Sequence, residues 1–398
     1  MVNESKRPLG LAWGIAFLSL IYAELNTPPT QNSFTNFLDA MTEDGPAACF
    51  GFLTGATVMY YLHHARDEEE ASRARYRIVM LAAFCLASGM ILNSIQVAIV
   101  PITVTIGIVA LIALPLSQLN NLALLLALLA STLLSALIHT VFIMEFPAGG
   151  PYPIVAWAAY GICGILIYRV LMGRRVYVYI LFWTGVLVGM LGILTVLPNY
   201  LPELFGISSD MGTYYRVNPQ TTSIRYLSST AHSGGLINVV GNFAAGTYLL
   251  SACFILQRFR FLEPIVSAGR LTLSIYPFYV LISAIFMAGF PGFSTELNSA
   301  LSSPSVSVKQ EELDWETFST WVDDSDSWDD LHIHSQHFYG NDGTSLIDKQ
   351  KTENIERSAF QWSYPFSALA FLIISTLWLR RFPDGLVEML LFRRRKAS

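Results

Sequence analysis

Hydrophobic residues gather in ten long stretches that are separated by polar turns and loops. The stretches cover about 9–25, 46–63, 78–95, 97–116, 122–144, 153–172, 176–197, 236–256, 268–290 and 363–379. A helix needs about 20 mostly apolar residues to cross a bilayer, because lipid offers no partner to an unpaired backbone N–H or C=O group. The pattern predicts an all-α fold, a polytopic transmembrane helical bundle of about ten spans.

Basic residues sort onto one side of this predicted bundle. With the N-terminus placed inside, that side receives Lys6, Arg7, Arg66, Arg73, Arg75, Arg77, Arg169, Arg174, Arg175, Arg258, Arg260, Arg270, Arg380, Arg381, Arg393, Arg394, Arg395 and Lys396. The other side keeps Arg216, Arg225, Lys309, Lys349, Lys351 and Arg357. Because Lys and Arg are retained at the cytoplasmic ends of spans, we expect both termini to face the cytoplasm.

Composition supports a membrane protein. The chain is 53% hydrophobic and 13% charged, which is too apolar for a soluble domain of 398 residues. A basic inner rim is typical of inner-membrane proteins, so it does not indicate nucleic acid, and the expected partner is the lipid bilayer. The first apolar stretch lacks a small-residue cleavage site and is expected to be a retained helix. All four cysteines lie in predicted spans, which argues against exported disulfides and zinc sites: Cys49, Cys85, Cys163 and Cys253.

The predicted organisation has three parts: spans one to nine over residues 1–290, an outer loop over 291–362, and the last span with a basic tail over 363–398. The outer loop interleaves six aspartates with Trp315, Trp321 and Trp328. Such a loop is either a small folded cap or a mobile acidic segment. It is also a candidate contact surface for a protein partner. His332, His334 and His337 have spacing compatible with a metal, but a solvated cluster is favoured, so no metal site is predicted.

Four regions of the chain are similar to the YeiB-like family of bacterial membrane proteins, which carries a domain of unknown function and is related to heparan-α-glucosaminide N-acetyltransferases. They are 50–55 (FGFLTG), 152–161 (YPIVAWAAYG) with Arg169 downstream, 231–235 (AHSGG), and 269–276 (GRLTLSIY) followed by 381–388 (RFPDGLVE). The match covers most of the chain apart from the acidic loop. Gly10 and Trp13 stand where the family's first helix usually has an acid and a base, and Leu386 stands where proline is usual.

The resemblance implies that an acyl group moves from a cytoplasmic donor such as acyl-CoA to an acceptor beyond the membrane, for example a glycan or glycolipid. Acyl-CoA would be a co-substrate, and no permanently bound cofactor is expected. The location implied is the bacterial plasma membrane. The missing acid and base leave a non-catalytic role open.

Acyl transfer needs a base to deprotonate the acceptor and hydrogen-bond donors to stabilise the oxyanion. His232 is the first candidate base, because it precedes Ser233, Gly234 and Gly235 at the predicted outer start of a helix. The alternative is that Ser233 only caps that helix. His139 is a second candidate, since an ionisable group inside a span is costly and often functional, although a hydrogen-bonded core histidine fits equally well. Glu24 is a third candidate of lower weight.

Arg270 is the candidate anchor for an anionic donor on the inner side, with Arg169, Arg258 and Arg260 as further members of a basic pocket. The alternative for each arginine is ordinary enrichment of positive charge at inner helix ends. Tyr276, two turns beyond Arg270, is a candidate lining residue on the route between the two sides.

Three classes of function therefore remain. A transmembrane acyltransferase requires a donor site inside and a base outside, and the chain has candidates for both. A transporter or flippase is expected to have broken helices and charges near the midplane. A membrane scaffold would use the acidic, Trp-rich loop as its contact surface.

Overall fold

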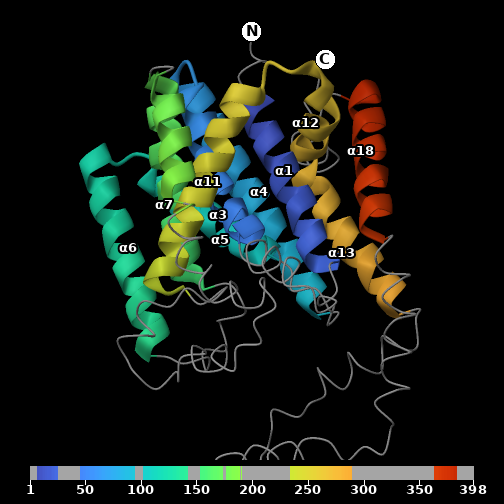
Figure 1. Ribbon diagram of the computed structural model, residues 1–398, viewed down its shortest axis with the longest axis horizontal. Helices are drawn as coiled ribbons and strands as arrows, with labels where there is room; N and C mark the ends of the chain where they lie inside the picture. Colours follow the sequence, from blue (N-terminus) through green and yellow to red (C-terminus); the bar gives the residue numbers. More distant parts are fainter. Residues whose placement is uncertain are drawn as a thin grey trace, which may run out of the picture. The chain divides into compact units, whose positions relative to one another are not determined.

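The computed structural model describes residues 7–25, 45–94, 102–141, 153–173, 176–188, 190, 234–288 and 363–382 (Figure 1). Within these ranges every regular element is a helix. The elements in order are α1 (Arg7–Leu25), α3 (Gly45–His63), α4 (Glu68–Ser94), α5 (Thr103–Leu116), α6 (Asn121–Val141), α7 (Ile154–Gly173), the helix Val176–Val188, α11 (Leu236–Leu256), η1 (Arg260–Leu262), α12 (Glu263–Arg270), α13 (Thr272–Ala288) and α18 (Ser363–Arg381).

Four of these helices are long and apolar enough to cross a membrane. They are α4, residues Asn121–Thr140 of α6, α7 and α11. Shorter apolar helices occur at Arg7–Ala23, Thr103–Leu116, Val176–Val188 and Thr272–Leu281. The described helices confirm the predicted all-α, membrane-type composition. The number of spans and the side on which the termini lie stay predictions.

Residues Met1–Ile282 and Gln361–Ser398 form one compact unit. A second unit, Ser283–Phe360, contains only the last residues of α13 among the described ones. In the first unit α1 contacts α3, α11, α12 and α18 (Figure 1). A helix that is hydrophobic on all sides is expected in the interior, and α1 is buried along most of its length.

Glycines bring α3 and α7 into backbone contact. The space in which a Cβ of Gly55 would lie is taken by the carbonyl group of Gly161, and that of Gly164 by the carbonyl oxygen of Phe52. Each glycine therefore directs a Cα–H group at a carbonyl of the opposite helix. Such contacts are common where small residues let two helices approach closely in a membrane.

The same arrangement joins α1 to α12. The carbonyl oxygen of Ile265 takes the Cβ position of Gly14, and the carbonyl oxygen of Gly10 takes that of Gly269. The close approach of both helix pairs therefore requires glycine, because any larger residue at these positions would force the two backbones apart.

Several polar helix ends gather at one end of the unit, which we call the Arg7 end. Arg7 at the start of α1 pairs with Glu263 at the start of α12 (3.1 Å) and donates to the carbonyl of Phe259 after α11 (3.1 Å). Tyr168 near the end of α7 packs on Phe254 near the end of α11 (6.4 Å between ring centroids) and on Tyr60 near the end of α3 (6.1 Å). The Arg7 end therefore contains the start of α1 and the ends of α3, α7 and α11.

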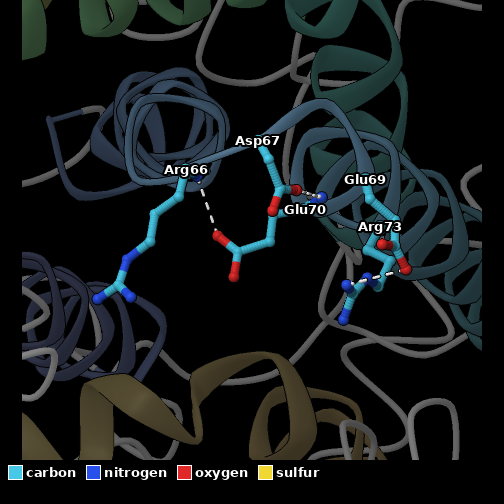
Figure 2. A network of polar contacts seen from close by, with 5 residues as sticks. All are labelled: Arg66, Asp67, Glu69, Glu70 and Arg73. Atoms are coloured by element: carbon cyan, nitrogen blue, oxygen red, sulfur yellow. Dashed lines mark hydrogen bonds and ion pairs between the residues drawn. The ribbon is translucent and has the colours of Figure 1, made fainter.

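Helix α4 begins earlier than the apolar stretch at 78–95 predicts. Asp67 accepts a hydrogen bond from the backbone N–H of Glu70 (2.7 Å), and the Glu70 carboxylate accepts one from the backbone N–H of Arg66 (2.9 Å). Glu69 pairs with Arg73 one turn on (3.0 Å; Figure 2). These contacts satisfy unpaired N–H groups at the helix start, so the helix extends into a polar segment that hydropathy cannot detect.

The ninth predicted span also differs. A single helix is expected over 268–290, but the chain is helical from Glu263 and is interrupted at Leu271. Helix α5, which corresponds to the fourth predicted span over 97–116, begins only at Thr103. Exposed leucines on α6 mark a face with no protein neighbour among the described residues: Leu122, Leu125, Leu126, Leu129, Leu133, Leu134 and Leu137.

Candidate functional site

The interruption between α12 and α13 is the most unusual backbone feature at the Arg7 end. Leu271 has φ −102° and ψ 2°, and its N–H donates to the carbonyl of Ala268 (3.1 Å) instead of continuing the α-helical pattern. The hydroxyl of Thr272 donates to the same carbonyl (3.2 Å). Pro277 lacks an N–H group and weakens the first turns of α13 further. Ala268, Leu271 and Thr272 are buried, so the chain itself satisfies the backbone polar groups at this break.

Arg270 forms the last turn of α12, where its side chain is exposed. Its Cγ atom would lie 3.2 Å from a Cβ added at Gly10, and Val266 Cγ1 would lie equally close. The aliphatic part of Arg270 therefore packs over Gly10, near the start of α1. This places the predicted donor anchor at the Arg7 end, as a basic residue at the exit of a short helix.

Trp13 has a structural role in this chain. Its indole Nε1–H donates to the hydroxyl of Thr57 (3.0 Å), and its ring meets Phe50 edge-on (5.2 Å between centroids). Gly10 and Trp13 both lie in the first half of α1. Here Gly10 makes room for α12 and Trp13 links α1 to α3, so both serve helix packing.

Tyr276 is a buried core residue, with 1% of its surface exposed. Its hydroxyl accepts a hydrogen bond from the backbone N–H of Ile102, just before α5 (3.3 Å). Its ring lies 6.4 Å from Phe17 and from Tyr279. Phe371 of α18 meets both Phe17 (5.4 Å) and Tyr279 (5.6 Å). Tyr276 thus belongs to an aromatic cluster that joins α1, α13 and α18. The spacing of Tyr276 and Tyr279 is the only sequence signal for this cluster.

Arg169 lies in different surroundings from Arg270. Its guanidinium donates to the carbonyl oxygens of Ser117 (2.6 Å) and Leu119 (2.8 Å), to the side-chain oxygen of Asn121 (2.8 Å), and to the sulfur of Met59 (3.4 Å). Four of its five N–H donors are thereby used to bind the turn between α5 and α6. These contacts indicate that Arg169 satisfies the C-terminal carbonyls of α5, a role that sequence reasoning missed.

Two further arginines from the predicted basic pocket lie on the connection between α11 and α12. Arg258 and Arg260 are both exposed. The Arg258 guanidinium stands over the ring of Phe259 (4.9 Å from Cζ to the centroid). Arg258, Arg260 and Arg270 therefore share the Arg7 end. Arg169 follows Tyr168 near the end of α7 and binds the α5–α6 turn.

A polar contact joins α6 to the start of α11 near the other sequence candidates. Ser135 donates to the carbonyl of Gly234 (2.9 Å), and both residues are buried. Gly234 has φ +71°, a conformation that favours glycine, and a Cβ there would lie 2.8 Å from the Ser135 oxygen. His139 is half-buried one turn beyond Ser135, so it lies on the same face of α6. His232, Ser233 and the side chain of Glu24 lie outside the described residues.

A buried amide lies between α11 and α7 on the same half of the bundle. Asn242 donates to the hydroxyl of Tyr160 (3.0 Å), and both side chains are almost fully buried. The loop 291–362, with its three histidines and three tryptophans, lies outside the described residues. In the ranges that are described, no group of three His, Cys, Asp or Glu side chains is placed to hold a metal ion.

No protein-family model, no curated protein and no solved structure matches this chain, so its function is inferred from its own residues.

Proposed function

We propose that this chain is a multi-span membrane acyltransferase that carries an acyl group from a cytoplasmic acyl-CoA to an acceptor on the far side, such as a glycan or glycolipid. The observation that carries the proposal is the position of Arg270. It is exposed on the last turn of α12, packs over Gly10 at the Arg7 end, and is followed at once by α13, whose Tyr276 lies in the buried core. An exposed cation thus stands where the chain turns into the bundle.

The donor would bind through its phosphates at the Arg7 end. A guanidinium offers paired N–H groups that match phosphate oxygens, and three exposed arginines, Arg258, Arg260 and Arg270, share this end. In this proposal the Arg7 end faces the cytoplasm, in agreement with the sorting of basic residues along the sequence. The membrane is the bacterial plasma membrane.

The acceptor would bind at the opposite end, near the contact of Ser135 with Gly234. His139 stands one turn beyond Ser135, and His232 precedes Gly234 by two residues in the chain. In the proposed step one of these imidazoles removes a proton from an acceptor O–H or N–H group. The acceptor atom attacks the thioester carbonyl, the C–S bond breaks, and the imidazolium returns its proton to the leaving CoA thiolate. The acyl-bearing arm of the donor must extend through the bundle for this step.

A transporter or flippase is the second candidate, and the interrupted helix favours it. Transporters bind substrates where discontinuous helices leave backbone groups unpaired. The break at Leu271 makes the α12–α13 helix discontinuous beside the exposed Arg270. The Leu271 N–H and C=O groups themselves are paired, with Ala268 and with Ser274 and Ile275. Transport and acyl transfer differ in whether a covalent product forms.

The deciding experiment measures acyl transfer by the purified protein with labelled acetyl-CoA and a mixture of membrane glycolipids, and thioester hydrolysis in their absence. Arg270→Gln is expected to lower turnover at limiting donor at least about tenfold, since one guanidinium–phosphate contact contributes about 1.5–3 kcal/mol. Arg73→Gln, which removes an exposed ion pair with Glu69, serves as the control with unchanged turnover.

His139→Ala and His232→Ala separate the two candidate bases in the same assay. A variant that loses turnover but keeps its affinity for acetyl-CoA identifies the residue that acts as the base. If the protein binds acetyl-CoA but forms no acyl product and releases no free CoA thiol, the enzyme proposal is wrong and transport becomes the better account. If it binds no CoA thioester at all, the scaffold class is favoured, and deletion of 291–362 then tests whether the acidic loop recruits a protein partner.

A further inference from the structure

The connection between α11 and α12 alternates basic and aromatic residues in an unusual way. It reads Arg258-Phe259-Arg260-Phe261, and all four residues are exposed. Phe261 keeps 75% of its surface exposed, which is the largest exposed fraction among the large hydrophobic side chains of the described residues. We call these four residues the Arg-Phe loop. Burial of an exposed phenylalanine ring against an apolar partner is favourable by up to about 1.5–3 kcal/mol. The exposed rings of the loop are therefore suited to contact an apolar partner.

The Arg-Phe loop is held in a fixed position. Arg7 donates to the backbone carbonyl of Phe259 (3.1 Å) and pairs with Glu263 (3.1 Å), so it links α1 to the loop and to the start of α12. The rings of Phe259 and Phe261 lie 5.7 Å apart at 41°, and the Arg258 guanidinium lies 4.9 Å from the Phe259 ring. The two rings and the neighbouring cation therefore form one surface.

The position of the loop along the chain identifies its surroundings. The candidate span Leu236–Leu256 ends two residues before Arg258. Two residues of chain reach at most about 7 Å, so the loop begins within the headgroup layer if the span crosses a bilayer. Aromatic side chains are enriched at this depth, and basic residues there contact the phosphates of anionic lipids.

The charges of the loop remain available for such a contact. Within the described part of the chain, neither Arg258 nor Arg260 forms an ion pair, whereas Arg7 is paired with Glu263. A partner that covers both the rings and the two cations must be apolar and anionic at once. We propose that the Arg-Phe loop is a docking site for an acidic phospholipid, with the headgroup phosphate on Arg258 and Arg260 and the acyl chains against Phe259 and Phe261.

This site shares Arg258 and Arg260 with the proposed donor site but does not include Arg270, and it requires only that the bundle lies in a membrane. The test uses the full-length protein in an uncharged detergent and measures its thermal unfolding midpoint with added phosphatidylglycerol or phosphatidylcholine. A ligand that binds the folded state raises the midpoint in proportion to its occupancy. Phosphatidylglycerol is expected to raise the midpoint more than phosphatidylcholine does.

The variant Arg258→Gln/Arg260→Gln is expected to weaken the apparent affinity for phosphatidylglycerol about 25-fold, because each surface arginine contributes a factor of about five. The control Arg66→Gln/Arg73→Gln removes the same charge from the α3–α4 turn and should keep the full effect. Phe259→Ser/Phe261→Ser should weaken the binding of both lipids, which separates the contribution of the rings from that of the charges.

Three results would overturn the proposal. One is an equal rise of the unfolding midpoint with phosphatidylglycerol and with phosphatidylcholine. Another is an equal loss of phosphatidylglycerol affinity in the control variant, which would show that only the net charge of the protein matters. The third is a matching rise with inorganic phosphate or a soluble polyglutamate peptide, which would identify a free anion or an acidic protein as the partner. Arg270→Gln should leave the lipid response intact, so failure of the donor site and failure of this site can be told apart.

Discussion

Gly269 of α12 directs its Cα–H group at the carbonyl oxygen of Gly10 in α1, so that the two backbones touch. The contact positions Arg270, the next residue, beside the start of α1. A methyl group at position 269 would coincide with the Gly10 carbonyl and would force the helices apart.

We therefore predict that Gly269→Ala lowers the free energy of unfolding by about 1–3 kcal/mol, the usual cost of overpacking. The matched control is Gly241→Ala in α11, where an added Cβ meets nothing within 4 Å. That control should raise stability by about 0.5–1 kcal/mol, because alanine has the better helix propensity. Thermal unfolding in detergent measures both, and equal behaviour of the two variants would argue against the close α1–α12 contact.

Arg169 is predicted to stabilise the protein without binding the donor. Arg169→Lys keeps the charge but cannot reproduce the four hydrogen bonds to the α5–α6 turn, so the carbonyls of Ser117 and Leu119 lose their donors. We expect a loss of about 2–4 kcal/mol in unfolding free energy, with acetyl-CoA affinity unchanged in the protein that remains folded. Weaker donor binding at unchanged stability would restore Arg169 to the donor site.

Trp13 and Thr57 are predicted to be energetically coupled. Trp13→Phe removes the indole N–H and leaves the Thr57 hydroxyl without this donor, which should cost about 1 kcal/mol. Thr57→Val should cost less in the Trp13→Phe background than in the wild type. A double-mutant cycle measures the coupling, and additive effects would show that the 3.0 Å contact contributes nothing.

The two candidate bases are predicted to act on one chemical step. If His139 and His232 share that step, the double variant His139→Ala/His232→Ala should be no slower than the slower single variant, because residues that act as a unit are not additive. Turnover at saturating acetyl-CoA is the measurement. Multiplied losses would indicate independent roles, and unchanged turnover in every variant would remove both residues from the mechanism.

The positions of most helices follow from the lengths of the apolar stretches. The expected segments 236–256 and 46–63 agree closely with α11 and α3, because each is bounded by residues that cannot enter lipid. The break at Leu271 was not predictable from hydropathy. The break is a change in a single hydrogen bond, from the Leu271 N–H to the Ala268 carbonyl, and a local average of hydrophobicity does not detect such a change.

The sequence is less informative about individual side chains. It indicates that Arg169 and Arg270 both lie at basic helix ends. Only the structure shows that Arg169 binds the α5–α6 turn, whereas the side chain of Arg270 is exposed beside Gly10. Likewise the sequence does not indicate the roles of Gly10 and Trp13. Their contacts with α12 and with Thr57 show that both serve helix packing. The role of His232 and of the acidic loop stays a prediction.

The account depends on the Arg7 end facing the cytoplasm, and labelling of a single introduced cysteine tests this most directly. Glu68 in the α3–α4 region is suitable, since 82% of its side chain is exposed, whereas the four native cysteines are buried. We predict that a membrane-impermeant maleimide leaves the Glu68→Cys variant unlabelled in intact cells and modifies it once the membrane is permeabilised. Full labelling in intact cells would place the basic end outside and contradict the proposed donor site.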